Sequence, residues 1–439
     1  MKKSPENRKQ VVNLRFHVGY DATSWPTGGS ADSFCAVTSA ARWLLRGKKW
    51  QVPAHFFLLG SAVSTFALGV RIPNQDPAAI ARGNAFVATA DNPSAIYYNP
   101  AGITQLKGHN AQVGALAYMN IYADYQSPSG NRTENDTEII PVPQLHYSFT
   151  PEGSFYSLGL GVYSPFGLSM KWPDDSPFAT RGIEGKLTYI TVNPVLALRL
   201  HPTLSIAAGP TFNHSELELR QAVGMVAGDR FKFKGDNFGY GFNVGLLWQP
   251  YEEWSFGLTY KSKVSVDHEG TASITPAPPF PGSFSSSAPL DFPQIITGGI
   301  SFRPTKDWNI EFDVDWTDWS SVEDLVVTGA STTTLDWHPS FFYEFGVTRN
   351  LSGGYYASAG YFYSQESTSE RYFLPTVPDT DLHVGSIGVG YKGARWTWAA
   401  AVQLIAGGWR KIDNNVNPSV NGKYKLLTPT LSLSAGYHF

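Results

Sequence analysis

Acidic side chains at regular spacing are the first candidates for chemistry in this sequence. Glu311, Asp313 and Asp315 recur at every second position, so in an extended strand all three carboxylates lie on one face. Three carboxylates on one face cannot point into lipid or into a dry core without a large desolvation cost. They must therefore face water or a polar lumen.

The motifs of common enzymes are absent from the sequence. There is no Gly-x-Ser-x-Gly elbow, no His-Glu-x-x-His and no Walker loop. Gly388–Gly393 fits a dinucleotide-binding spacing, but it lies in an alternating stretch with no helix after it. The ten histidines show no metal-ligand spacing. We expect no enzymatic activity, no cofactor and no metal, although a lipid hydrolase with its Ser and His on neighbouring strands remains an alternative.

The composition favours a membrane barrel over other classes of protein. Only 16% of the 439 residues are charged and the net charge is -3, so nucleic acid is not an expected partner and no acidic block suggests a solvating tail. Aromatic residues make up 14% and there are 42 glycines, yet the mean hydropathy of -0.19 is too low for a bundle of membrane helices. The single cysteine, Cys35, excludes an internal disulfide framework. Strands that alternate apolar and polar residues explain this combination.

The start of the chain has the features of a targeting segment. An uncharged stretch between Lys49 and Arg71 has an apolar centre of about 15 residues, short of the roughly 20 that a spanning helix needs. Basic residues precede it and small residues end it, which predicts a signal peptide over 46–69, with an uncleaved anchor as the alternative. Because a signal peptide should begin near a start codon, we expect residues 1–45 to be a gene-model extension or disordered.

From about residue 110 to the end, the sequence predicts β-strands. Trp254–Tyr260 and Ile310–Trp316 alternate without a fault. The even count of about fourteen strands is typical of a single-chain bacterial barrel, which we assign to 110–439. The Pro-rich stretch 267–291 predicts an irregular loop. The expected strand centres lie near residues 116, 145, 159, 193, 209, 241, 259, 297, 312, 345, 359, 387, 401 and 434.

The last strand, Leu431–Phe439, alternates and ends in an aromatic residue. Outer-membrane barrels commonly end in such a strand, which the barrel-assembly machinery recognises. We therefore expect a bacterial outer-membrane location, contacts with outer-membrane lipid and with that machinery, and a monomer.

Residues 70–109 do not alternate, and their small residues and capping Asp and Asn suggest short helices joined by turns. An α-rich piece before the first strand is well placed to fill the lumen as a hatch, here called the plug (residues 70–109). A periplasmic tail is the alternative. The expected fold is thus an all-β transmembrane barrel of about 14 antiparallel strands with a small α-rich hatch in the lumen.

In the plug, Arg82–Phe86 and Asp91–Gly102 resemble the N-terminal hatch of the long-chain fatty acid transporter (FadL-type) outer-membrane family. Asn99, Pro100 and Ala101 match the Asn-Pro-Ala hatch motif of that family. The resemblance runs from about residue 67 to the end, and residues 1–45 depart from it. It implies passive uptake of long-chain fatty acids or related hydrophobic compounds, which leave sideways through an opening in the wall. Further matching stretches are Tyr163–Gly167, Ile190–Pro194, Asp315–Ser320, Pro378–His383 and Gly388–Tyr391.

A transporter of hydrophobic molecules needs an apolar capture surface and a wall that can open. Gly161 and Pro194 are the candidates for a strand break, because Gly and Pro within strands permit bulges and kinks. The most apolar of the long loops is the candidate capture surface, and simple packing of the loop or of the aromatic girdle is the alternative. The candidate capture residues of this loop are Phe166, Leu168, Met170, Trp172 and Phe178.

A fatty acid also needs a partner for its carboxylate, and two arginines could supply it by a bidentate pair. Leucines alternate with Arg199, so Arg199 is expected to point into the lumen. Leu217 and Leu219 share a face, which would place Arg220 in the lumen with Glu216 and Glu218. Pairing with such lumenal acids is the structural alternative. A channel specific for hydrocarbons or aromatics, a purely structural barrel and a general porin are the competing functions.

Overall fold

The computed structural model describes residues 69–276 and 282–439. The predicted extension and all of the predicted signal peptide except Gly69 lie outside the described residues. Within the described part of the chain, every helix falls short of the length and apolar character that crossing a membrane requires.

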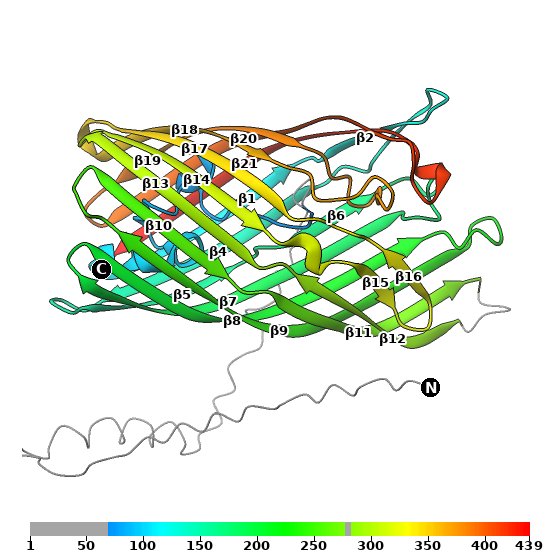
Figure 1. The fold of residues 1–439 in the computed structure, drawn as a ribbon, viewed down its shortest axis with the longest axis horizontal. Helices are drawn as coiled ribbons and strands as arrows, with labels where there is room; N and C mark the ends of the chain where they lie inside the picture. The colour runs from blue at the N-terminus through cyan, green and yellow to red at the C-terminus, as the bar shows by residue number, and fades with distance from the viewer. Residues whose placement is uncertain (1–68, 277–281) are drawn as a thin grey trace, which may run out of the picture. The chain divides into compact units, whose positions relative to one another are not determined.

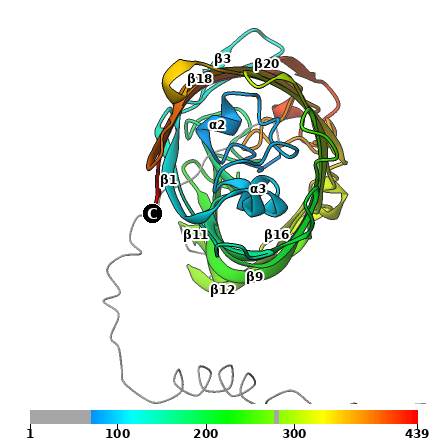
Figure 2. The ribbon, with the colours of Figure 1, turned by 90° about the vertical axis from the view of Figure 1, so that its left-hand side faces the viewer.

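Fourteen antiparallel strands form a closed barrel, which confirms the predicted fold class (Figures 1 and 2). The first and last strands close it, from Asn110 opposite His438 to Tyr118 opposite Thr430. Every predicted strand centre falls within one of these strands. The barrel strands are β1 (Gly108–Met119), β4 (Ile139–Thr150), β5 (Tyr156–Tyr163), β7 (Glu184–His201), β8 (Leu204–Gln221), β9 (Arg230–Trp248), β10 (Trp254–Lys261), β13 (Ile295–Thr305), β14 (Trp308–Thr317), β17 (Ser340–Asn350), β18 (Tyr355–Ser364), β19 (Leu382–Lys392), β20 (Trp396–Ile412) and β21 (Gly422–His438).

The two ends of the barrel differ. One end has short turns and carries Gly108 and the C-terminus, whereas the other has long loops with their own short strands (Figure 1). We call these the short-turn end and the long-loop end. The additional strands are β2 (Tyr122–Gln126), β3 (Arg132–Glu134), β6 (Gly167–Lys171), β11 (Val264–Thr275), β12 (Ser283–Phe292), β15 (Asp324–Val327) and β16 (Ser331–Thr334), and the 3-10 helices outside the plug are η2 (Trp319–Ser321), η3 (Ser352–Gly354) and η4 (Pro418–Val420).

The prediction of an irregular loop over 267–291 is wrong. β11 and β12 form a regular hairpin, paired from Val264 opposite Phe292 to Ser273 opposite Ser283, and β11 also pairs with β9. The first proline of the stretch, Pro276, comes after the last paired residue of β11, so the prolines that suggested irregularity leave most of the ladder intact.

The strands change the polarity of their two faces along their length. In β21, the part toward the short-turn end exposes Leu433 on the outer face and turns Thr430 and Ser432 inward, as a lipid-embedded barrel requires. Toward the long-loop end the order reverses, because Tyr424 and Leu426 are buried inside while Lys423 and Lys425 face outward. We call the first part the membrane band and the second the outer extension.

β8 shows the same reversal. Ile206 and Phe212 are exposed on the outer face of the membrane band, whereas further along the strand Leu217 is buried inside and Glu218 lies on the outer face. The β7–β8 register stays constant over this stretch, so the change comes from the sequence and not from a bulge. The reversal marks the level at which lipid outside the wall gives way to water.

The plug lies inside the barrel (Figure 2). It contains α2 (Pro77–Ile80), α3 (Ala95–Tyr98) and η1 (Pro100–Gln105), and it ends where β1 starts at Gly108, two residues before the predicted boundary. Asp76 caps α2 by accepting a hydrogen bond from the Ala78 amide, with Pro77 in the first turn. These short helices and turns place a series of backbone amides against the barrel wall.

Candidate functional site

The Asn-Pro-Ala motif connects the plug to the wall. The Asn99 side chain caps η1 by accepting from the Ala101 amide at 3.2 Å, and it donates to the Val87 and Leu246 carbonyls at 2.8 and 3.0 Å. Leu246 belongs to β9, so one amide group spans the plug and the barrel. Pro100 begins η1 and Ala101 is fully buried. The geometry of the motif is that of an anchor.

The three carboxylates of β14 hold the plug. The Arg71 guanidinium donates to both oxygens of Asp315, at 2.5 and 2.8 Å, and to the Thr317 hydroxyl at 2.7 Å. Both partners are almost fully buried, and the Phe342 ring covers the guanidinium at 4.8 Å. Removing one partner of such a pair typically costs about 3–5 kcal/mol, because the other charge stays buried.

The other two carboxylates of this face accept hydrogen bonds from plug amides. Asp313 accepts from Phe86 and Val87 at 2.8 and 2.9 Å. Glu311 accepts from the Ala88 and Thr89 amides at 2.7 and 3.1 Å, from the Thr89 hydroxyl, and from Arg82 at 3.1 Å. The predicted polar lumen is therefore filled by the plug, whose amides and arginines replace water around the acids.

The plug approaches the wall so closely at several barrel glycines, Gly257 and Gly346 among them, that no side chain would fit there. A Cβ atom at Gly257 would lie 2.1 Å from the Val87 carbonyl oxygen, and one at Gly346 would lie 2.4 Å from that of Arg82. Both contacts are with backbone, which cannot move aside as a flexible side chain could. Both glycines therefore lie on the lumenal face of their strands, and only the fold reveals what they contact.

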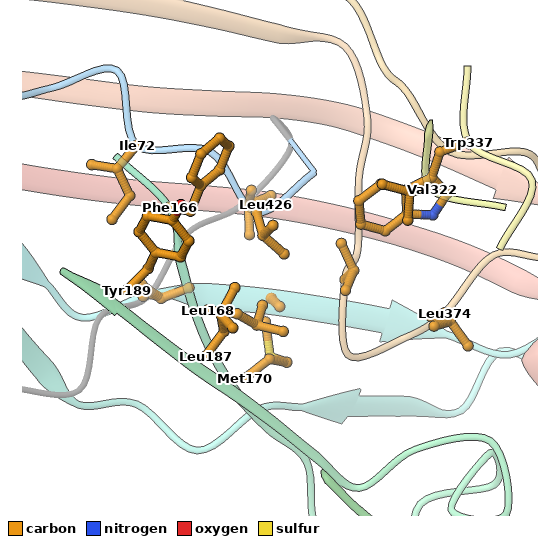
Figure 3. Packing of buried hydrophobic residues seen from close by; sticks show 14 of the residues in the cluster. Ile72, Phe166, Leu168, Met170, Leu187, Tyr189, Val322, Trp337, Leu374 and Leu426 are labelled. Carbon is orange, nitrogen blue, oxygen red and sulfur yellow. The ribbon is translucent and has the colours of Figure 1, made fainter. Parts of the chain in front are cut away.

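The predicted capture residues all belong to one buried cluster in the outer extension. Together with Ile72, Leu187, Tyr189 and Leu426 they form the apolar cluster shown in part in Figure 3. Their exposed fractions run from 0% to 5%, so they pack against the loops and do not line an open groove in this conformation. Their role in capture stays a prediction. The members predicted from sequence are Phe166, Leu168, Met170, Trp172 and Phe178.

The two candidate arginines lie apart. Arg199 is near the short-turn end of β7, and its guanidinium donates to the Thr104 carbonyl of the plug. The prediction that Arg220 lies in the lumen is wrong. Arg220 shares the outer face of β8 with Phe212 and pairs with Glu184 and Asp174 at 3.0 and 2.9 Å.

The reversal of polarity is the reason for this error. Leu217 and Leu219 belong to the outer extension, where apolar residues point inward. The residues that alternate with them, Glu216 and Glu218, therefore point outward. They form ion pairs with Lys234 and Lys232, respectively. A phase shift of the apolar pattern within β8, from even to odd positions, was the available signal.

Tyr163–Gly167, one of the stretches singled out in the sequence, forms an inward bend of the wall, which we call the bend. The sequence did not indicate this shape. The plug pairs with the bend, through Ile72 donating to Pro165 at 2.7 Å and Gly167 donating to Val70 at 2.8 Å. The β4–β5 ladder stops at Leu145 opposite Val162. Among the described residues, β4 from Ile139 to Gln144 therefore has no strand partner on that side.

The predicted break points behave differently. Gly161 lies in a regular ladder and allows Ile96 of the plug to approach, since a Cβ there would lie 2.9 Å from that side chain. The β7–β8 ladder is interrupted beside Pro194, between the pairs Val192–Phe212 and Leu196–Ala208. The Asn193 side chain bridges this interruption by donating to the Pro210 carbonyl at 2.9 Å.

Comparisons with known proteins agree with this architecture. Residues 58–439 match the family described as outer membrane protein transport protein (OMPP1/FadL/TodX). The long-chain fatty acid transport protein of Escherichia coli O6:H1 is 23% identical over 352 residues, which cover 69% of this chain and 78% of that protein.

Solved structures also share the fold. A Pseudomonas aeruginosa FadL homologue superposes with a TM-score of 0.76 at 18% identity, covering 84% of this chain and 100% of that one. The Pseudomonas putida toluene transporter TodX superposes with a TM-score of 0.67 at 15% identity, covering 86% and 99%. With the family match over most of the sequence, the chain belongs to the OMPP1/FadL/TodX family and is a bacterial outer-membrane transporter of hydrophobic compounds, not an enzyme.

Proposed function

We propose that this protein takes up long-chain fatty acids or closely related amphiphiles by passive diffusion, and that the cargo leaves sideways through the wall at the bend. The observation that carries the proposal is the order of environments inside the barrel. An apolar cluster fills the outer extension, and a charged plug interface lies below it in the membrane band.

This order favours a sideways path on energetic grounds. An acyl chain gains roughly 25 cal/mol per Å² when it moves from water into the apolar cluster. Continuing through the plug would bring the chain against buried carboxylates and arginines, where neither the chain nor the charges gain anything. A route through the wall instead leads from one apolar environment to another, the bilayer.

The bend is the proposed gate. On the side of the bend toward the short-turn end, the Leu145–Val162 pair closes the wall. On the side toward the long-loop end, Ser169 donates to Glu138, and the Asp136 amide donates to the Lys171 carbonyl at 2.8 Å. Between these limits β4 has no partner on that side. Because residues 70–72 of the plug hold the bend inward, a displacement of the plug would release it.

A reversible lock tests this gate. Arg71 and Phe166 are opposite each other in a non-hydrogen-bonded pair, in which Cα atoms are typically about 4.5 Å apart and a disulfide can form. In a Cys35→Ser background, the pair Arg71→Cys/Phe166→Cys should block oleate uptake when oxidised and regain it on reduction. The comparison within one variant cancels the cost of losing Arg71.

The assay uses bacteria that lack their own transporter of this family and measures uptake of radiolabelled oleate. The single variants Arg71→Cys and Phe166→Cys show the effect of each substitution without the bridge. Equal uptake by the oxidised and reduced double variant would exclude gating at the bend.

Uptake of an aromatic hydrocarbon is the second candidate function. Phe166 and Tyr189 both pack against Phe292, at ring-centroid distances of 5.0 and 4.5 Å, and such a group suits a flat apolar ring. Parallel measurements with toluene and oleate separate the two. Uptake of toluene without oleate would favour the hydrocarbon channel.

For assembly, we propose that the C-terminal strand is recognised by the barrel-assembly machinery and that the finished protein is a monomer in outer-membrane lipid. Phe439 is 76% exposed at the end of β21, and its amide donates to His109 at 3.0 Å. Phe439→Ala should slow barrel assembly, as followed by heat-modifiable gel mobility.

A further inference from the structure

Lys261 lies where the apolar cluster meets the plug. It is the last residue of β10 and shares the lumenal face with Ser255 and Gly257, both of which approach the plug. Its Nζ atom sits over the Tyr97 ring, 4.5 Å from the centroid. The side chain thus reaches the boundary between the two environments.

Lys261 differs from the other cations at this level because it has no anion of its own. Arg71 pairs with Asp315 and Arg82 pairs with Glu311. Among the described residues, no carboxylate lies within ion-pair distance of the Lys261 ammonium group, which contacts the Tyr97 ring instead. A partly buried ammonium group gains from an anion that reaches it.

Two cavities meet at Lys261. The one on the plug side, of ≈ 20 Å³, is already lined by Arg71, Asp315 and Glu344. The one on the other side has a volume of ≈ 40 Å³, room for about three water-sized groups. Lys261 is the one charged residue among the described residues that line this second cavity. Its other lining residues include Tyr97, Tyr163, Pro165, Phe166 and Tyr189.

The second cavity adjoins both the apolar cluster and the bend. Phe166 and Tyr189 belong to the apolar cluster, and Tyr163 and Pro165 belong to the bend. A molecule with its chain among the cluster residues would place its terminal group beside Nζ. That arrangement fits an amphiphile that carries one negative charge at the end of a long apolar chain.

We propose that Lys261 binds the carboxylate of such an amphiphile beside the gate, and so gives fatty acids an advantage over uncharged molecules of the same length. The site rests on the proposed uptake function and specifies its cargo. The carboxylate enters as an acceptor for the ammonium hydrogens, in a cavity that otherwise offers tyrosine, threonine and asparagine groups.

The first test compares cargo selectivity. Lys261→Met should lower oleate uptake roughly tenfold or more and leave uptake of 1-octadecene unchanged, because only the acid uses the charge. Lys261→Arg should keep most oleate uptake. Lys263→Met is the matched control, since Lys263 is two residues away, exposed, and paired with Asp291 at 2.9 Å.

Equal losses for oleate and 1-octadecene would assign Lys261 a purely structural role and overturn the proposal, as would no loss for either. If the wild-type protein takes up neither compound, the proposed function itself fails, which is a different result. Heat-modifiable mobility of each variant verifies that the barrel is folded.

A second test uses the wild-type protein and so does not depend on a variant. Purified protein in detergent is incubated with oleate and a carbodiimide, which joins a bound carboxylate to a neighbouring amine as an amide. Mass spectrometry should find the oleoyl amide on Lys261 and not on Lys263. A label on both lysines, or on neither, would contradict a specific site.

Discussion

The membrane band and the outer extension of this barrel use the same strands with opposite polarity. In the membrane band, apolar residues such as Leu433 face lipid, and polar residues face a plug held by Asp313 and Asp315. In the outer extension, Leu426 faces inward and Lys425 faces water. The wall has one geometry throughout, so the solvent on each side decides which residues each face carries.

The comparison also explains how one barrel can both take in a hydrophobic molecule and keep its lumen closed by the plug. The apolar interior of the outer extension offers a favourable place for a hydrophobic molecule. The charged interior of the membrane band keeps the plug in place by many directed bonds. Four experiments test this contrast.

The largest effect is expected at the interior of the membrane band. Arg71→Ala leaves the Asp315 carboxylate buried without its partner, at a cost of about 3–5 kcal/mol. The plug should loosen, so planar-bilayer recordings should show a higher ion conductance than for the wild type. Lys411→Ala, which removes an exposed and solvent-screened pair with Asp413, should leave both stability and conductance close to those of the wild type. Similar effects of the two substitutions would contradict the anchoring role of β14.

The second experiment moves charge across the boundary on the outer face of β21. Leu433→Lys places a charge against lipid and should cost about 2–4 kcal/mol, as measured by denaturant unfolding in liposomes. Lys425→Leu, eight residues away on the same face, should be close to neutral because that position already meets water. If both substitutions destabilise the barrel equally, the boundary does not lie between them.

The third experiment concerns Arg220, the arginine that sequence reasoning placed in the lumen. Because it is on the outer face with Asp174 and Glu184, Arg220→Ala should change stability by less than about 1 kcal/mol. Oleate uptake should stay at the wild-type level. A selective loss of oleate uptake would return this residue to the list of carboxylate partners.

The smallest effect is expected in the turn between β8 and β9, outside the barrel wall. Four backbone amides, from Val223 to Val226, donate to Asp229 at 2.7–3.0 Å and lower the pKa of its carboxyl group to about 2 from the usual 3.8. A depressed pKa means that the ionised form stabilises the turn above pH 4, and that this contribution disappears as the pH falls toward 2.

Hydrogen exchange of the Val223–Val226 amides should follow that change, with protection lost near pH 2 while the barrel strands stay protected. Asp229→Asn should give the unprotected turn at neutral pH as well. Unchanged protection in the variant would show that the amides do not depend on the charge.

Local pattern was enough to predict the strands. Alternation depends on neighbours two residues apart, so each of the predicted centres, for example residue 387 in β19, falls within a barrel strand. For Glu311, Asp313 and Asp315, the sequence predicted only that the carboxylates face a polar environment. Their partners were not, because Arg71 and Phe86 precede them by more than 220 residues, and no local pattern connects the two segments.

The two errors have different causes. Arg220 was misplaced because the leucines of β8 were assigned to the lipid-facing side, whereas in the outer extension the apolar residues point inward. The β11–β12 hairpin was taken for an irregular loop because its stretch is rich in proline, although the strands pair regularly. In this protein the wall continues into water with the pattern inverted. The bend and the role of Lys261 depend on which segments meet in three dimensions, so they required the structure.

The close fit at Gly257 and Gly346 has a consequence for the order in which the molecule is built. A finished cylinder with backbone of the plug against backbone of the wall leaves no clearance through which the plug could later be threaded. The barrel closes where the first strand pairs with the last, so it can close only after the whole polypeptide is present. We infer that the barrel strands assemble around a plug that is already in position, and that the plug serves as a template for closure of the wall.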